Sequence, residues 1–168
     1  TSGEPKITET ISYGIKNEEL LLIASSLENN SEHPLAQAII KSAKEKGLKL
    51  LMVNNFKALP GQGVFGEIKQ KKYYLGNINL MRELNFILPE RETDKLEKQG
   101  KTIIYLSDDK KILGLFAVAD KIKDDAPAVI AALKKYGLKT IMLSGERQET
   151  ANYIATHAGI DELIAEVS

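Results

Sequence analysis

The chain has 168 residues, of which 43% are hydrophobic and 27% charged, so it can bury a core and has the composition of a soluble globular protein. Its 23 Lys and Arg balance its 23 Asp and Glu, so the basic excess typical of nucleic-acid and membrane-surface binders is missing. The absence of cysteine excludes a disulfide framework and a thiolate metal site within these residues.

The first part of the chain predicts helices and short strands. Apolar residues recur at helical spacing in 17–30 and in 34–47, where Pro34 suits the first turn and Gly47 the end. Three short runs have the character of strands and surround the loop ALPGQG: 48–53, 63–69 and 71–76. Two short helices are predicted after them: 77–85 and 90–100.

The pattern changes after residue 98. Apolar strands are expected at 102–108, 112–120 and, as a buried strand, 138–145. Helices are expected at 124–137 and 146–159, and a further strand begins in the last nine residues. Strands that alternate with helices at this spacing predict a parallel sheet with crossover helices. We therefore expect a small α+β unit before the boundary and a doubly wound α/β unit after it.

The stretch SEHPLA, residues 31–36, allows two interpretations. In the structural one, Ser31 caps a helix, Pro34 occupies its first turn, and His33 has no further role. In the functional one, His33 and Glu28 face one pocket at the corner between two helices. A neutral His can stack on an adenine, and a carboxylate can accept its exocyclic amino protons.

The glycines of LPGQGVFGEI form GxGxxG at Gly61, Gly63 and Gly66. A dinucleotide-binding fingerprint needs a helix after this motif, and the sequence that follows alternates as strands do. A tight hairpin turn and a close approach of the backbone to a flat ligand remain as interpretations. Gly76, at the end of the next strand, allows the same two.

Two later segments carry candidate phosphate-binding residues. Ser144 and Gly145 follow a strand and precede a helix, where an α/β sheet commonly binds ligands, although Ser144 could instead only cap the helix. Asp120 and Lys123 follow another strand. They could face phosphates, or they could be solvated charges at a helix start.

Together these segments resemble the nucleotide-binding domain, with part of the phosphorylation domain, of heavy-metal-transporting P-type ATPases of the copper/zinc type. The likeness runs in order over nearly the whole chain. Its motifs are SEHPLAQAI for the signature SEHP(L/I)A, LPGQGVFGEI for the glycine loop, YYLGNINLM for the GN segment, FAVADKIKDDA for DxxK and IMLSGERQETA for TGDxxxTA. Here SGE replaces TGD, so Glu146 keeps the charge of the family Asp but is one methylene longer.

The resemblance implies an α/β fold in which a small α+β nucleotide-binding domain, an antiparallel sheet flanked by helices (12–98), is inserted in a phosphorylation domain (1–11 and 99–168). The latter would be a partial haloacid-dehalogenase-like, Rossmann-type parallel α/β domain. The implied adenosine-binding residues are Glu28, Glu32, His33, Gly61, Gly63 and Gly76. Ser144 and Gly145 would be catalytic, with the Ser144 hydroxyl at the transferred phosphoryl group, and Asp120 and Lys123 would face the nucleotide phosphates.

The implied function is that of an ATP-binding catalytic fragment of a metal-exporting P-type ATPase, with copper as the expected ion. TSGEPKIT resembles the tail of DKTGTLTxGxPxVT, which places the phosphorylated Asp before Thr1, so we expect ATP binding without a phosphoenzyme. Mg²⁺ would be held mainly by residues outside this chain. No residue of this chain is predicted as a metal ligand. The partners would be the remaining phosphorylation, actuator and transmembrane domains, and the fragment would be a cytoplasmic part of an integral membrane protein. The alternatives are a haloacid-dehalogenase-like phosphatase and a non-catalytic nucleotide-binding module.

Overall fold

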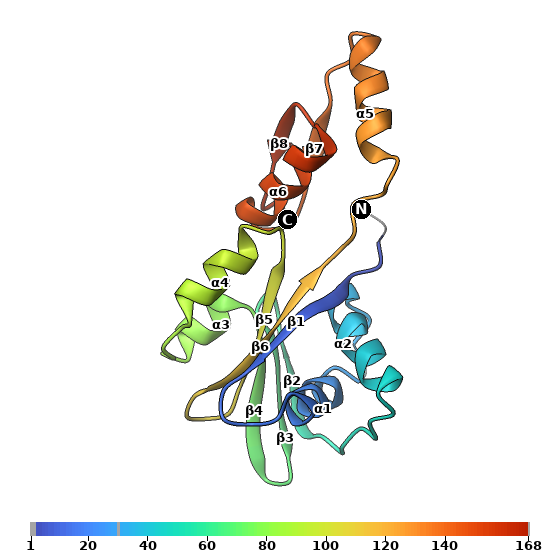
Figure 1. Cartoon of the computed structure of the whole chain (residues 1–168). Coiled ribbons are helices and arrows are strands. Elements are labelled where there is room, and N and C mark those ends of the chain that lie inside the picture. The colour runs from blue at the N-terminus through green and yellow to red at the C-terminus, as the bar shows by residue number, and fades with distance from the viewer. Residues whose placement is uncertain (1–2, 30, 168) are drawn as a thin grey trace.

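The computed structural model describes residues 3–29 and 31–167, and its main feature is a six-stranded sheet (Figure 1). All neighbouring strands in it are antiparallel, in the order β1-β6-β5-β4-β3-β2. The strands are β1 (Lys6–Ser12), β2 (Asn54–Leu59), β3 (Gly63–Ile68), β4 (Lys71–Gly76), β5 (Thr102–Ser107) and β6 (Ile112–Ala119).

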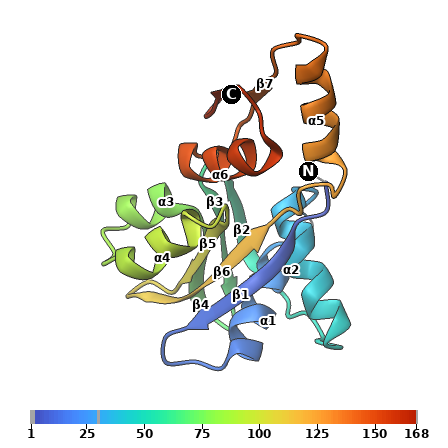
Figure 2. The same cartoon turned by 45° about the horizontal axis from the view of Figure 1, so that its top comes forward.

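Two pairs of helices cover the two faces of this sheet (Figure 2). On one face lie α1 (Asn17–Leu27) and α2 (Pro34–Glu45), and on the other lie α3 (Ile78–Glu83) and α4 (Glu90–Glu97). Successive residues of β5 point to opposite faces: Ile104 and Leu106 join the core under α1 and α2, and Ile103 and Tyr105 join the core under α3 and α4. Burial on both faces explains why β5 and β6 are continuously apolar.

The remaining elements form a smaller unit beyond the end of the sheet (Figure 1). They are α5 (Ala126–Lys135), β7 (Ile141–Leu143), α6 (Gln148–Ala158) and β8 (Glu162–Ile164). β7 and β8 are parallel, and α6 connects them as a crossover helix. The predicted βαβ arrangement is therefore confirmed for these two strands.

The structure corrects the prediction of a buried strand at 138–145. Ile141 is 51% exposed and Leu143 66%, and Ile164 on β8 is 52% exposed. Apolar strands of parallel sheets are normally covered on both faces. Ile141 and Leu143 point to the same face of the β7–β8 pair, and this face is left largely open in the described part of the chain.

The structure also corrects the predicted sheet membership of 102–108 and 112–120. β5 and β6 were expected in the parallel unit, but they pair antiparallel with β4 and β1. The tight turn between them, in which Asp108 N–H donates to the Lys111 carbonyl, makes them a hairpin, and a hairpin is antiparallel. The strand pairing thus joins residues 6–12 and 102–119 to the sheet of the unit expected at 12–98.

The strand predicted at 48–53 is also wrong. This segment is irregular, and β2 begins only at Asn54. Its apolar residues Leu48, Leu50, Leu51 and Val53 pack against the core beneath α1 and α2. Their hydrophobicity reflects burial without strand pairing. Within the described ranges no helix is long and apolar enough to cross a membrane.

Candidate functional site

Two adjoining cavities lie at the end of the large sheet that faces the smaller unit. This smaller unit, which consists of α5, β7, α6 and β8, is called the α6 unit. The first has a volume of about 390 Å³ and the second about 750 Å³. Both are lined by the same central residues, namely His33, Leu35, Asn77, Thr102 and Ile103. A ligand that fills one cavity can therefore extend into the other.

The first cavity brings together most of the predicted adenosine-binding residues. Glu28 comes from the end of α1, His33 from the start of α2, Gly61 and Gly63 from the β2–β3 turn, and Gly76 from the end of β4. Glu32 is exposed and lies outside the lining of both cavities. The fold thus brings together segments that lie almost fifty residues apart in the sequence.

Glu28 is a buried acceptor on the wall of the first cavity. Its Oε2 atom is inaccessible to solvent and has no hydrogen-bond partner among the described residues. Burial raises the pKa of Glu28, while a hydrogen bond with Ser31 and the nearby His33 act in the opposite direction. A buried carboxylate oxygen without a donor is costly, so this atom is suited to accept a hydrogen bond from a ligand.

His33, not Ser31, caps α2, which corrects the structural interpretation of SEHPLA. The Leu35 N–H donates to His33 Nδ1 at 3.2 Å, and Pro34 occupies the first turn. Because Nδ1 accepts this bond, the neutral ring carries its proton on Nε2. The cap therefore fixes the orientation of a ring that lines both cavities.

The glycines form a hairpin and not a dinucleotide fingerprint. Gly63 and Gly66 lie in β3, so no helix follows the motif. Gly61 has φ +71° in the turn before β3, a backbone conformation that favours glycine. The hairpin interpretation is confirmed, and Gly61 and Gly63 lie in the cavity wall in addition.

Asn77 links the walls of both cavities and was not among the predicted site residues. Its Oδ1 accepts from the N–H groups of Asn79 and Leu80 at 3.0 and 3.2 Å, which caps α3. Its Nδ2 donates to the Gly61 carbonyl at 2.8 Å. The signal was present in the sequence, since Asn after a strand and before an apolar helix is a typical cap.

Ser144 and Gly145 lie in the second cavity, as a phosphate-contacting role requires. The Ser144 hydroxyl accepts from the Glu146 N–H at 3.1 Å, and α6 begins only at Gln148. The alternative in which Ser144 caps that helix is therefore wrong. Ser144 stabilises the turn between β7 and α6, which holds its hydroxyl at the cavity wall.

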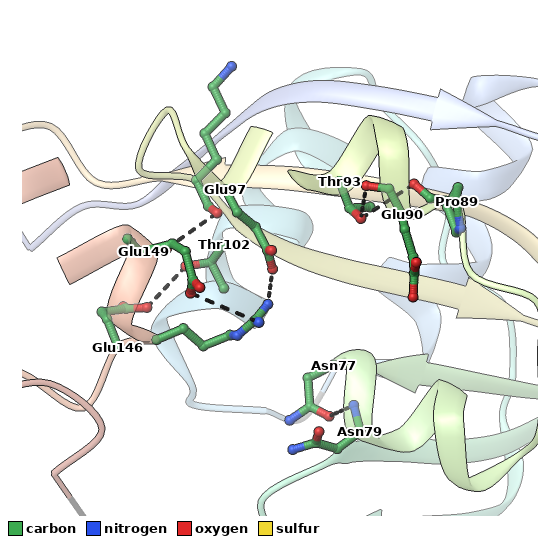
Figure 3. A network of polar contacts seen from close by, with 12 residues as sticks. Asn77, Asn79, Pro89, Glu90, Thr93, Glu97, Thr102, Glu146 and Glu149 are labelled. Carbon is green, nitrogen blue, oxygen red and sulfur yellow. Dashed lines mark hydrogen bonds and ion pairs between the residues drawn. The ribbon is translucent and has the colours of Figure 1, made fainter. Parts of the chain in front are cut away.

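Six of the sixteen residues that line the second cavity are charged (Figure 3 shows part of this cavity). Three of them are carboxylates, namely Glu97, Glu146 and Glu166, and Asn77 and Asn79 add two amides to the wall. Its cationic side chains are Arg82, Lys101 and Arg147. The three cations and two amides can donate hydrogen bonds to an anionic ligand, and the three carboxylates balance the positive charge.

Several contacts join the α6 unit to the rest of the chain across this cavity, among them a hydrogen bond from the Thr150 hydroxyl to the Lys101 carbonyl at 3.4 Å. Arg147 forms an ion pair with Glu97 at the end of α4, and Thr102 donates to Glu146 Oε2 at 3.1 Å. Burial raises the pKa of Glu97, and Arg147 partly offsets that effect. Glu97, Thr102 and Arg147 were not among the predicted site residues, because nothing in the sequence shows that α4 and α6 meet.

The structure does not bring Asp120 and Lys123 into either cavity. Asp120 directly follows β6, and its Oδ2 accepts from the Gly3 N–H at 3.1 Å. Lys123 is exposed in the loop before α5. Their predicted role at the nucleotide phosphates thus remains a prediction.

The chain belongs to the haloacid dehalogenase-like hydrolase family, whose model matches residues 1–168. It is similar to a copper-exporting P-type ATPase B of Archaeoglobus fulgidus (36% identity over 99% of this chain and 24% of the relative). It is also similar to a copper-exporting P-type ATPase of Bacillus subtilis (40% identity over 99% of this chain and 21% of the relative). The chain thus spans less than a quarter of the length of these relatives.

The similar solved structures are also P-type ATPases or their domains. The catalytic domain of the CPx-ATPase CopB-B, studied for its conformational changes upon nucleotide binding, matches with a TM-score of 0.72 and 27% identity over 100% of this chain and 57% of that one. A zinc-transporting PIB-type ATPase matches with a TM-score of 0.70 and 27% identity over 99% of this chain and 27% of that one. The N-domain of HMA8, a copper-transporting P-type ATPase, matches with a TM-score of 0.56 and 26% identity over 69% of this chain and 99% of that one.

Proposed function

We propose that this chain is the ATP-binding part of the catalytic region of a heavy-metal-transporting P-type ATPase, with copper as the transported ion. One observation carries the proposal: Glu28, His33, Gly61, Gly63 and Gly76 line one cavity that continues into a second cavity with Ser144. Adenosine would occupy the first cavity, and the phosphates would extend into the second.

The chemistry of each wall fits this placement. The orphaned Glu28 Oε2 would accept a hydrogen bond from the exocyclic amino group of adenine, and the His33 ring would pack against the base. The cations of the second cavity would neutralise the phosphates. In phosphoryl transfer the protein mainly positions the reacting groups and stabilises charge, which is the role proposed for Ser144 and Gly145.

We further propose that an aspartate outside this chain accepts the phosphoryl group, and that Mg²⁺ is held mainly by residues outside it. Residues 3–29 and 31–167 contain no group of three or more His, Cys, Asp or Glu side chains placed for a metal ion. Asp120 and Lys123 would approach the phosphates only after a rearrangement. The whole protein would use the aspartyl-phosphate to drive export of the metal ion across its membrane, with this region in the cytoplasm.

The proposed partners are the remaining phosphorylation, actuator and transmembrane domains of the same protein. The open face of the β7–β8 pair supports the first of these, because a parallel sheet is normally covered on both sides. We place the end of the nucleotide-binding domain after Ala119 and not near residue 98. The continuous antiparallel sheet supports this placement, as does the match of a separate N-domain to 69% of the chain.

Calorimetric titration of the 168-residue chain with ATP and GTP tests the proposal. We expect ATP to bind more tightly than GTP. We also expect the substitution His33→Ala to lower the affinity of the chain for ATP. Because His33 caps α2, the Ala variant also loses about 1 kcal/mol of stability. His33→Asn is the matched control, since Asn caps helices well but has no ring: it should keep the stability and still lose ATP affinity. Equal binding of both nucleotides, or no loss in either variant, would contradict an adenine site here.

A further inference from the structure

Arg147 is the residue through which the α6 unit contacts the helix at the other side of the second cavity. It immediately precedes α6, and its guanidinium forms an ion pair with the Glu97 carboxylate at the end of α4. Glu149, in the first turn of α6, lies at 4.0 Å from the same guanidinium. Figure 3 shows Glu97 and Glu149 converging on this point from two different elements. Arg147 is therefore held by carboxylates in a cavity that contains two further cations, Arg82 and Lys101.

The two members of this ion pair differ in their exposure. The side chain of Glu97 is 12% exposed, and that of Arg147 is 44% exposed. Another cation of the same cavity, Lys101, is held at 2.5 Å by Glu9, which lines neither cavity. Of the three cations of this cavity, which include Arg82, Arg147 is the one that forms an ion pair with another lining residue among the described residues. Its partial exposure leaves the guanidinium accessible to a ligand.

We propose that Arg147 binds the phosphates of the nucleotide, and that Glu97 holds its guanidinium in the free protein and releases it when nucleotide enters. This inference rests on the function proposed above and adds to it a phosphate-binding residue, Arg147, and a positioning residue, Glu97. A guanidinium binds phosphate oxygens through paired N–H donors, as it binds a carboxylate, so the exchange preserves its geometry. A nucleotide polyphosphate carries more negative charge than one carboxylate, which favours the exchange.

Arg147 lines the cavity that the phosphates of a bound nucleotide would enter. The first and second cavities share His33, Asn77 and Thr102, so a base held beside Glu28 directs its phosphates toward Ser144 and Arg147. Glu97 then loses its cationic partner in a nearly buried place. Burial already raises the pKa of Glu97, which supports uptake of a proton there when Arg147 leaves.

Titration of the whole chain with ATP, ADP and adenosine tests the proposal. Arg147→Gln should lower the affinities for ATP and ADP by about ten- to a hundredfold, because a charge-assisted contact is lost. The affinity for adenosine should not change. Glu97→Gln should raise the affinity for ATP severalfold, because the carboxylate that competes for Arg147 is gone. The affinity for adenosine should again not change. The double variant should bind ATP as weakly as Arg147→Gln alone.

Arg91→Gln is the control with the same change of charge, since Arg91 is exposed on α4 outside both cavities. This variant should keep the ATP affinity of the unaltered chain. If Arg147→Gln and Glu97→Gln both lower the unfolding temperature but leave the ratio of ATP to adenosine affinity unchanged, the pair is only structural and the proposal is overturned. If the unaltered chain binds neither adenosine nor ATP, the function proposed above fails instead. The two failures are therefore distinguishable.

Discussion

Gly63 and Gly76 face each other across the β3–β4 ladder at the mouth of the first cavity. A Cβ on Gly63 would lie 2.1 Å from the Leu75 carbonyl oxygen, and a Cβ on Gly76 would lie 2.2 Å from the Gln62 carbonyl oxygen. Each glycine thus permits the backbone of the opposite strand to approach closely. The wall of the candidate adenosine site is built from backbone at this point, which leaves room for a flat ligand.

Gly63→Ala is therefore expected to be severe. The new Cβ meets backbone that cannot turn aside, and φ at this position is +151°, which L residues rarely adopt. We expect a loss of about 3 kcal/mol or more in the free energy of unfolding, measured by chemical denaturation. Gly61→Ala is the matched comparison, because φ there is +71° but no atom lies within 4 Å of the added Cβ. It should cost only about 1–2 kcal/mol, from backbone strain, and equal losses would contradict the steric argument.

The sequence predicted those parts of the fold that depend on local rules. Helices at 17–30 and 34–47 were found because apolar spacing, Pro34 and Gly47 act within a few residues. The hairpin at Gly61 and Gly63 was found because its turn chemistry is local. Partners distant in the chain were not predictable in this way, and the wrong sheet for β5 and β6 followed from that.

Asn77 is expected to stabilise the junction of the two cavities through both ends of its amide. Asn77→Ala removes the cap of α3 and the bond to the Gly61 carbonyl, so we expect a loss of about 2 kcal/mol. Asn77→Asp keeps the capping oxygen but loses the donor to Gly61, and should lose about half as much. Thermal unfolding of both variants measures this, and a more stable Ala variant than Asp variant would contradict the division into two roles.

The same limit of sequence reasoning applies to the site. Glu28, His33 and Ser144, which the motifs singled out because their segments have recognisable patterns, line one pair of cavities, and their roles there remain predictions. The contact of Glu97 with Arg147 joins positions fifty residues apart and has no local signature. The exposure of Ile141 and Leu143 was also not predictable, since an apolar run has the same sequence whether or not it is covered.

Glu146 uses its extra methylene to reach Thr102. Its Oε2 accepts from the Thr102 hydroxyl at 3.1 Å, and Asp would fall short by about 1.5 Å, one C–C bond. Glu146→Asp and Thr102→Val should each lower the free energy of unfolding by about 1 kcal/mol. The double variant should lose less than the sum, because the two residues share one bond, and this double-mutant cycle is measured by denaturation. Full additivity would mean that the bond contributes nothing to stability.

Glu28 should make both stability and base selectivity depend on pH. Burial raises its pKa in the folded protein, so the folded state holds the Glu28 proton more tightly than the unfolded state. Its contribution therefore favours folding at low pH and is lost as the pH rises from the ordinary glutamate pKa, about 4.3, through the raised folded-state pKa. Glu28→Gln should remove this decline and be more stable than the unaltered chain at neutral pH.

Selectivity should change in the opposite direction over the same window. The ionised carboxylate accepts from the amino group of adenine, whereas the protonated group can donate to the carbonyl oxygen of guanine. The ratio of ATP to GTP affinity is therefore expected to rise as Glu28 loses its proton, and Glu28→Gln, which can both donate and accept, should show a low ratio at every pH. His33 is present in both proteins, so their difference isolates the carboxyl group. Glu45→Gln, exposed at the end of α2, should follow the unaltered chain. Calorimetric titration across the window measures the ratio, and the same pH dependence in Glu28→Gln would exclude Glu28 as the group that reads the base.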